Sequence, residues 1–291
     1  MLPVFYIIVS AENTPYMAWQ AKLFHFSCVS RTSAVPLIFV HGGAGRELDP
    51  SYADVVRAGG VVCRAGSFRA SPAGDSYAAR NTPGTLLSAA ELCEDPDALF
   101  VLCDPDMLFV RSPTFAQRLS ADSTNFMDYS EPAVLSAAER LGISGEELVA
   151  RNSTLQCAVP HVIPAMIARP FAETWLDAID VFPKRGYIDS MYAFVLAALS
   201  LQLDIEITRH VITDYTPDAA LCDADMIHYG YGDARWNKRD YMTAEQIERV
   251  WDPPPPSGDA TVYGEIARQL REAHAYYERA GQQDRGVPRC K

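Results

Sequence analysis

The sequence predicts an α/β fold in which helices flank a doubly wound, mixed β-sheet. Short apolar runs alternate with amphipathic segments through the N-terminal third, an order typical of strands and helices in turn. Hydrophobic residues make up 48% of the chain, enough for a substantial core, and the 21% of charged residues argues against global disorder. We expect one α/β domain over residues 1–252, followed by a Pro-rich linker and a C-terminal helix over residues 253–291.

The N-terminal third supplies the most regular part of this pattern. The expected strands lie at 4–9, 36–40, 61–64 and 99–102, and the expected helices at 15–30, 52–58 and 81–92. A polar turn at 10–15 ends the first strand, and small polar residues at 65–80 predict a surface loop. Asn81 is expected to cap the helix that contains Pro83 in its first turn. The order is that of a Rossmann-type nucleotide-binding half.

The rest of the chain is less regular. The expected helices lie at 132–141, 145–152, 165–181, 186–201 and 262–279, and the expected strands at 125–129, 157–163 and 204–212. Residues 183–186 form the link between two of these helices, and the prolines at 253–256 form a stiff linker. The glycine-rich segment 41–45 lacks both the dinucleotide fingerprint and the P-loop lysine, so it predicts only a turn.

Two carboxylates follow the fourth expected strand. Asp104 and Asp106 come directly after the apolar run 99–102, and Pro105 prevents this run from continuing as a central strand. Ligands of open α/β sheets bind at the carboxyl ends of strands. Two acidic groups there need a cation, and a divalent metal ion is the natural partner. The alternative is a solvated turn in which Asp106 caps the next segment.

A histidine near the C-terminal end of the α/β region could complete a metal site. His228 follows an apolar segment and precedes the glycines 230 and 232. A neutral imidazole is a good ligand for manganese, and glycines let a backbone approach a phosphate closely. The cations Arg235, Lys238 and Arg239 follow in the chain and could assist, or could lie on the surface. The alternative for His228 is a hydrogen-bonded turn histidine.

The net charge limits the kinds of partner that we expect, and the cysteine content indicates the redox environment. The net charge of −12 and the pI near 4.9 disfavour nucleic acid or an anionic membrane surface as a partner. The seven cysteines are scattered and include no Cys-X-X-Cys pair, which is typical of reduced thiols in a cytoplasmic protein. The N-terminal apolar run is too short to span a bilayer and has no basic residues before it, so we expect a soluble protein.

Three blocks, taken together in this order, resemble the plant hydroxyproline O-arabinosyltransferases and the related peptidyl-serine O-galactosyltransferases. They read Tyr77-Ala-Ala-Arg-Asn-Thr-Pro-Gly84, Leu102-Cys-Asp-Pro-Asp-Met-Leu-Phe-Val-Arg-Ser-Pro113 and Ile227-His-Tyr-Gly-Tyr-Gly232. Segments 17–22 and 189–193 also resemble parts of these enzymes, so scattered blocks between residues 4 and 240 are covered. The resemblance implies a GT-A-type fold and a metal-dependent enzyme that retains the anomeric configuration of a nucleotide sugar. Residues 1–252 would then form the catalytic, nucleotide-sugar-binding domain.

The resemblance also implies roles for individual residues. Asp104, Asp106 and His228 would hold Mn²⁺ or Mg²⁺. The expected nucleotide-sugar-binding residues are Ser10, Ala11, Glu12, Asn13, Asn81, Asp104, Pro105, Tyr231, Gly232 and Lys238.

A carboxylate near the anomeric carbon would stabilise an oxocarbenium-like centre. Asp189 and Asp128 are the candidates for this role, and His161 could orient a sugar hydroxyl. The alternatives are charge matching at a helix N-terminus for Asp189 and a place at a strand end for His161.

Three functions remain open at this point. The first is transfer of a sugar from a UDP- or GDP-sugar to a small-molecule or peptide hydroxyl. The second is a mutase on the same fold, which interconverts pyranose and furanose rings without a flavin, since no flavin fingerprint is present. The third is a non-catalytic protein that binds a sugar nucleotide. The intact set of Asp104, Asp106 and His228 favours the two enzymatic functions.

Overall fold

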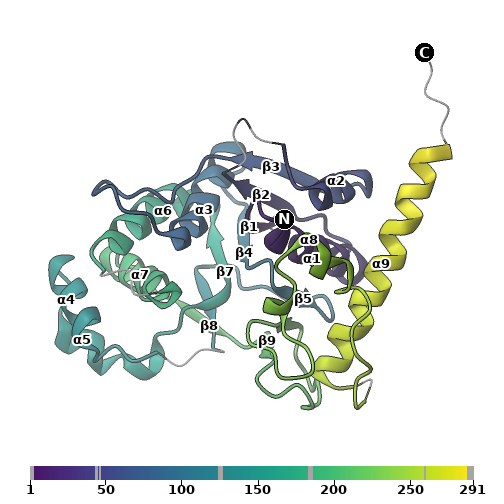
Figure 1. The fold of residues 1–291 in the computed structure, drawn as a ribbon. Coiled ribbons are helices and arrows are strands. Elements are labelled where there is room, and N and C mark those ends of the chain that lie inside the picture. Colours follow the sequence, from purple (N-terminus) through teal and green to yellow (C-terminus); the bar gives the residue numbers. More distant parts are fainter. Residues whose placement is uncertain are drawn as a thin grey trace. The chain divides into compact units, whose positions relative to one another are not determined.

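Figure 1 shows the fold in a computed structural model, which describes residues 3–42, 45, 47–123, 127–182, 186–258 and 260–286. The strands are β1 (Phe5–Glu12), β2 (Leu37–His41), β3 (Val61–Ala65), β4 (Leu99–Cys103), β5 (Met107–Phe109), β6 (Ser120–Asp122), β7 (Ala158–Pro164), β8 (Glu206–Thr208), β9 (Val211–Thr213) and β10 (Met226–His228). The helices are α1 (Pro15–Thr32), α2 (Pro50–Arg57), α3 (Asn81–Leu92), α4 (Pro132–Arg140), α5 (Gly145–Ala150), α6 (Ala165–Asp180), α7 (Tyr187–Ser200), α8 (Ala244–Glu248) and α9 (Val262–Gly286).

The strands confirm the predicted α/β class. Seven of them form a sheet in the order β3-β2-β1-β4-β7-β6-β8, and a smaller sheet has the order β5-β10-β9. The larger sheet is mixed, because β4 runs parallel to β1 and antiparallel to β7. This arrangement is compatible with a Rossmann-like fold.

Contacts along the chain divide it into two compact units. Unit 1 comprises Met1–Ser10, Ala65–Cys103 and Thr114–Arg209, and unit 2 comprises Ala11–Arg64, Asp104–Pro113 and His210–Lys291. The boundary at Cys103 falls directly before the two carboxylates that the sequence singles out. Both of these carboxylates therefore belong to unit 2.

Unit 1 is organised around β4. All five of its residues are buried, which explains why this segment is continuously apolar rather than alternating. Phe5 of β1 pairs with Leu99 in parallel register, and Pro164 of β7 pairs with the same residue on the other side. Helix α6 packs against both α3 and α7. Aromatic rings of α6 and α7, including Trp175 and Phe194, fill the core of this unit.

Unit 2 is organised around α1. Its N-terminus is capped by the Thr14 hydroxyl, which accepts a hydrogen bond from Met17 N at 3.2 Å, and Pro15 occupies the first turn. Helix α1 packs against α2, α9 and β5. Gln269 of α9 donates a hydrogen bond to the carbonyl oxygen of Phe109 at 2.8 Å. This contact fixes the long C-terminal helix to β5.

Several expected elements differ in detail. Residues 10–12 extend β1 instead of starting a turn, and residues 204–212 contain two short strands, β8 and β9, in different sheets. In the expected strand at 125–129, residues 125 and 126 lie outside the described residues and 127–129 are not a strand. Parts of the expected turn at 41–45 (43 and 44) and of the link at 183–186 (183–185) also lie outside them.

Asn81 is the first residue of α3 rather than its cap. Its side-chain oxygen accepts a hydrogen bond from Phe68 N at 3.0 Å, which ties the preceding loop to the helix. A loop contact has therefore replaced the expected cap.

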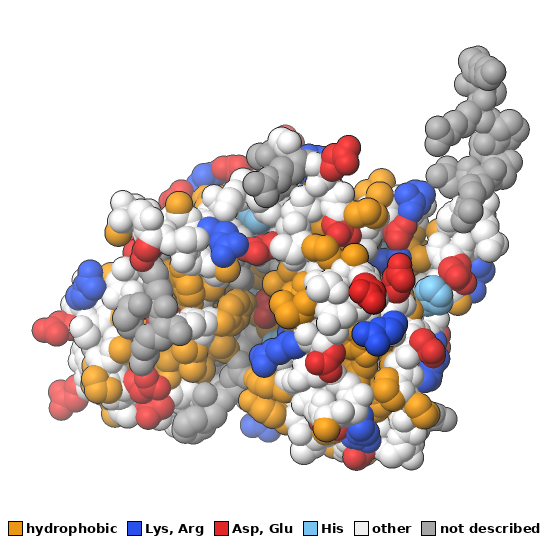
Figure 2. All heavy atoms as spheres, viewed as in Figure 1, with side chains coloured by type: hydrophobic (Ala, Val, Ile, Leu, Met, Phe, Trp, Pro, Cys, Tyr) orange, Lys and Arg blue, Asp and Glu red, His pale blue; other side chains and the backbone are white. Residues whose placement is uncertain are grey.

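The surface carries both signs of charge. Figure 2 shows acidic and basic side chains interspersed over the described surface of that face. Because the overall charge is negative, the binding of an anionic ligand would depend on a local cluster of cations. Among the described residues, no helix combines the length and the apolar character needed to cross a membrane.

Candidate metal centre

The metal candidate residues meet because two strands of unit 2 pair. Asp106 directly precedes β5, and β5 runs antiparallel to β10 with Met107 opposite His228. The pairing continues one step further, because Tyr229 N donates to the carbonyl oxygen of Asp106 at 3.0 Å. This register brings His228 beside Asp106, although the two lie far apart in the sequence.

Three potential ligand atoms converge at this point. One atom each from Asp104, Asp106 and His228 lies within 4.8 Å of the others. His228 Nε2 is 3.3 Å from Asp106 Oδ1, and Lys238 Nζ forms an ion pair with Asp106 Oδ2. The Asp106 and Lys238 side chains are each only 11% exposed, so this ion pair is largely screened from water. The centre therefore combines two carboxylates, one imidazole and one ammonium group.

The neighbouring charges set the protonation of this cluster. Burial alone would raise the pKa of Asp106, but the Lys238 ammonium and the His228 imidazole outweigh it and lower that pKa. Burial lowers the pKa of His228 and of Lys238, and Asp106 reverses the direction in both, so that both pKa values are raised. Asp106 is thus an ionised carboxylate at neutral pH, available as a ligand.

The residues fit a divalent metal ion. Carboxylate oxygens with one imidazole are donors that suit manganese or magnesium better than soft metals. Three protein ligands leave coordination positions for water or a phosphate. A methyl group added at Gly230 would lie 3.5 Å from His228 Nε2 and 3.8 Å from Asp106 Oδ2. The absence of a side chain at this glycine therefore keeps space beside the ligand atoms.

Asp214 is a buried residue of this centre that the sequence analysis missed. It is 2% exposed and accepts hydrogen bonds from the backbone N–H groups of Tyr231 at 3.0 Å and Gly232 at 2.7 Å. Burial raises its pKa. Asp214 follows β9 in the way that Asp104 follows β4, and a carboxylate directly after an apolar strand was the available signal. Its role is to hold the loop that follows His228.

The backbone conformation at position 232 explains why this loop has a glycine there. Its φ is +74°, a conformation that favours glycine, and an added methyl would lie 2.7 Å from Asn237 Cα. Asn237 in turn donates a hydrogen bond to the carbonyl oxygen of Tyr231 at 3.0 Å. The loop between His228 and Lys238 is therefore closely folded onto itself.

Tyr16 is a second residue of this region that the sequence analysis missed. It lies half-buried in the first turn of α1, within electrostatic range of Lys238 and Asp106, and burial raises its pKa. The same end of α1 contributes Trp19, whose ring stacks on Tyr229 at a centroid distance of 6.3 Å. Nothing in the local sequence around Tyr16 signals this proximity, because it depends on the packing of α1.

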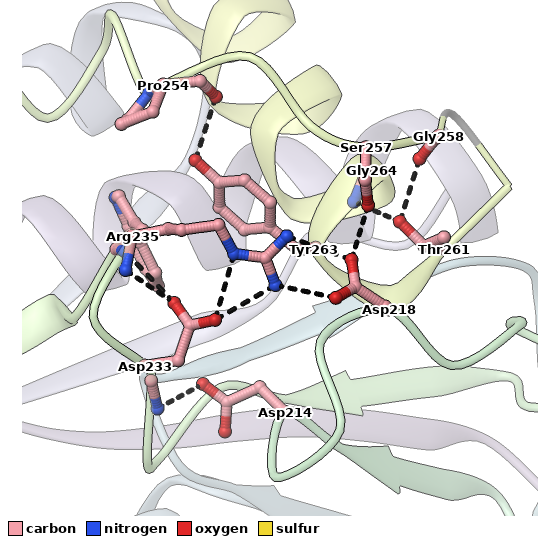
Figure 3. A network of polar contacts seen from close by, with 12 residues as sticks. Asp214, Asp218, Asp233, Arg235, Pro254, Ser257, Gly258, Thr261, Tyr263 and Gly264 are labelled. Atoms are coloured by element: carbon pink, nitrogen blue, oxygen red, sulfur yellow. Dashed lines mark hydrogen bonds and ion pairs between the residues drawn. The ribbon is translucent and has the colours of Figure 1, made fainter.

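Two of the candidate cations, Lys238 and Arg235, have different partners. Lys238 contacts Asp106, whereas Arg235 lies in a polar network with Asp218 and Asp233 (Figure 3). Arg235 donates two hydrogen bonds to Asp218, at 2.9 and 3.1 Å, and another to Asp233 at 2.9 Å. Its guanidinium also lies over the ring of Tyr263, 5.4 Å from the centroid. Arg235 thus fixes the loops of its own network.

The other predicted residues of unit 2 lie at the end of β1 and in the turn after β4. Asn13 donates a side-chain hydrogen bond to the carbonyl oxygen of Glu47 at 2.9 Å and accepts one from Asp49 N at 2.9 Å. The carbonyl oxygen of Glu12 accepts a hydrogen bond from Tyr52 at 2.7 Å. Ala11 is buried, and the carbonyl oxygen of Pro105 accepts a hydrogen bond from Tyr229 at 3.3 Å.

The remaining predicted residues belong to unit 1, and these are Ser10, Asn81, Asp128, His161 and Asp189. Asp128 accepts hydrogen bonds from Ser130 N at 2.9 Å and from Ser130 Oγ at 2.6 Å, and these lower its pKa. It closes a local turn. Asp189 is fully buried in the first turn of α7, where a carboxylate is favourable to the helix. Ser10 is half-buried within β1.

His161 has an apolar environment. Its Nε2 lies 2.9 Å from the carbonyl oxygen of Cys157, so this nitrogen carries the hydrogen and donates it. The ring stacks on Phe194 at a centroid distance of 4.0 Å, and burial lowers its pKa to about 4. Its other nitrogen, Nδ1, has no hydrogen-bond partner among the described residues. This environment is that of a neutral core histidine.

Comparison with known proteins does not identify a family. The chain matches no model of a protein family and no curated protein.

Proposed function

We propose that this protein is a metal-dependent enzyme that acts on a UDP- or GDP-sugar. It cleaves the bond between the anomeric carbon and the diphosphate with retention of configuration, and transfers the sugar to a hydroxyl of a small molecule or peptide. The observation that carries the proposal is the convergence of Asp104, Asp106 and His228 within 4.8 Å. Lys238 forms an ion pair with the Asp106 carboxylate of this cluster. The sequence resemblance to GT-A-type O-glycosyltransferases supports the same function.

The residues of the centre suit a diphosphate leaving group. Asp104, Asp106 and His228 would hold Mn²⁺ or Mg²⁺, which when bound acts as a Lewis acid toward phosphate oxygens. Lys238 supplies a second positive charge beside the carboxylates, and its largely buried ammonium interacts strongly with an anion. The leaving diphosphate gains negative charge in the transition state. This arrangement would therefore stabilise the transition state more than the bound substrate.

The test is incubation of the protein with Mn²⁺ and a panel of UDP- and GDP-linked hexoses and pentoses, without an acceptor. Chromatography and proton NMR would resolve the products, and Asp106→Ala would serve as the inactive variant. Asp223→Ala is the matched control, because Asp223 is a fully exposed acidic residue of the same unit. We expect slow release of free nucleotide and sugar by the wild type and the control, but not by Asp106→Ala.

Other outcomes assign a different function. A new isomer of equal mass, formed by the wild type only in the presence of metal, identifies a pyranose/furanose mutase and overturns simple transfer. Metal-dependent binding of a nucleotide sugar without turnover identifies a non-catalytic binding protein. If no nucleotide sugar binds in the presence of Mn²⁺, the proposed function is wrong.

A further inference from the structure

Two tyrosine rings form a stacked pair beside the metal centre. The rings of Tyr215 and Tyr231 have centroids 3.6 Å apart and planes inclined by only 19°. Tyr215 is 64% exposed, among the most exposed of the large apolar side chains, whereas Tyr231 is half-buried beneath it. An exposed aromatic ring that is already stacked on its inner face presents its outer face to solvent.

The pair is held by the same residues that hold the metal loop. Asp214, the residue before Tyr215, accepts the backbone hydrogen bond of Tyr231 at 3.0 Å. Asn237 donates to the carbonyl oxygen of Tyr231 at 3.0 Å, so both backbone groups of Tyr231 are fixed. The two rings therefore have a defined position and lose little conformational freedom when a ligand binds.

The pair also lies close to the ligand atoms. Tyr231 follows Gly230, where an added methyl group would be within 3.8 Å of both His228 Nε2 and Asp106 Oδ2, and the Tyr231 side chain lies within electrostatic range of Asp106. A group attached directly to a metal-bound phosphate lies within a few ångströms of the metal. In a nucleotide sugar the sugar ring is attached directly to the β-phosphate, the ribose is attached to the α-phosphate, and the base is separated from both phosphates by the ribose.

We propose that Tyr215 and Tyr231 form a stacking platform for the sugar ring of the nucleotide sugar. The platform rests on the proposed function and adds a specificity determinant to it. The face of a tyrosine ring carries negative charge density, which attracts the polarised C–H groups on the apolar face of a sugar. The side chains of the two tyrosines also share a hydrogen bond, which adds to the stacking contact in holding the pair together.

The experiment compares ligands that have or lack the sugar. Isothermal titration calorimetry with Mn²⁺ would measure the affinity for the free diphosphates, UDP and GDP. It would also measure the affinity for the conjugate, which is the UDP- or GDP-linked sugar of the panel that binds the wild type most tightly. We expect Tyr215→Ala to weaken binding of the conjugate about tenfold and to leave the affinity for the free diphosphate within about twofold. Tyr215→Phe keeps the ring and should retain the affinity of the wild type.

A matched control separates the platform from a general loss of exposed apolar surface. Val56 on α2 is 54% exposed in the same unit, and Val56→Ala should not change either affinity. Saturation-transfer NMR provides a second readout, in which tyrosine irradiation reaches sugar protons in the wild type and less so in Tyr215→Ala. Near-ultraviolet circular dichroism would verify that the remaining aromatic core is unchanged.

The outcomes distinguish the platform from the proposed function. If Tyr215→Ala weakens the binding of the free diphosphate and of the conjugate equally, the tyrosine pair contacts the nucleotide and the proposed sugar platform is overturned. If it changes neither affinity, the platform is also overturned, while metal-dependent binding by the wild type upholds the proposed function. If the wild type binds no nucleotide sugar with Mn²⁺, both inferences are wrong.

Discussion

His161 in unit 1 and His228 in unit 2 are two histidines with opposite environments. Both lie on strands among apolar residues, and the sequence marked both as functional candidates. His161 is surrounded by aromatic rings, with Phe194 at 4.0 Å and Trp175 at 5.6 Å. His228 instead contacts Asp106 at 3.3 Å and lies within electrostatic range of Asp104 and Lys238. One is part of a core, and the other is part of a charged cluster.

The comparison shows that the neighbouring strand decides the role of a buried histidine. Burial lowers the pKa of His161 to about 4, because little opposes the desolvation of a charged ring there. Burial acts on His228 in the same direction, but the Asp106 carboxylate reverses the shift and raises its pKa. That carboxylate is present only because β5 pairs with β10 in one register.

The largest effect should come from Asp106→Ala. We expect it to abolish Mn²⁺ binding and to lower the free energy of unfolding by about 4 kcal/mol, because Lys238 loses its partner in a largely buried position. Calorimetry with Mn²⁺ and urea unfolding would measure the two effects. The double variant Asp106→Ala/Lys238→Met should recover stability but not metal binding. Retention of the wild-type Mn²⁺ affinity in Asp106→Ala would contradict the metal centre.

His161→Ala should affect stability alone. Removing a ring packed between Phe194 and Trp175 leaves a cavity, and we expect the free energy of unfolding to fall by about 3 kcal/mol. The Mn²⁺ affinity should stay within about twofold of wild type at a temperature where the variant is folded. His161→Phe should recover most of the stability. A large change in Mn²⁺ affinity in a folded variant would instead give His161 a role in function.

The pH dependence of stability should also reveal the apolar environment of His161. His161 has a folded pKa of about 4 against an ordinary value of 6.5, so between these values the unfolded chain binds more protons than the folded protein. Its contribution is therefore fully present above pH 6.5 and is lost as the pH falls toward 4. From pH 7.5 to 5.0 we expect a loss of about 2 kcal/mol from this residue. Urea unfolding of the wild type and of His161→Phe at both pH values would measure this loss. If both proteins lose the same free energy of unfolding between pH 7.5 and 5.0, the prediction is wrong.

The smallest effect should come from Gly230→Ala. The added methyl group would occupy space 3.5 Å from His228 Nε2 and 3.8 Å from Asp106 Oδ2, and we expect about tenfold weaker Mn²⁺ binding with little change in stability. Gly281→Ala on α9 is the control, because a methyl group there meets nothing within 4 Å. An unchanged Mn²⁺ affinity in Gly230→Ala would place the metal on the other side of the ligand atoms.

Local patterns predicted the regular elements well. The buried run of β4 and the long helices α6 and α7 have strong periodicity or continuous apolar character, and their bounds differ by one or two residues from those expected. The strand expected at 204–212 is instead two strands, because its residues pair with β6 in one sheet and β10 in another. Such a division depends on distant partners, which local alternation does not contain.

The candidate site was predictable only in part. Asp104, Asp106 and His228 were identified from motifs, and their convergence agrees with that prediction. Asp214 and Tyr16 were missed, because their proximity to the centre comes from β9 beside β10 and from the packing of α1. Arg235 and Lys238 looked alike in the sequence, yet acidic residues from separate segments pair with each of them. Long-range packing therefore determined what the motifs left open.

The pairing of β5 with β10 has a consequence for the synthesis of this protein. Lys238 and Asp106 are 132 positions apart in the chain, and His228 reaches the carboxylates only after its own strand has formed. A nascent chain that has emerged only as far as β9 contains both carboxylates but neither the imidazole nor the ammonium group. Metal capture at the proposed centre should thus begin late in translation, and manganese binding would report that the segment from β10 onward has docked.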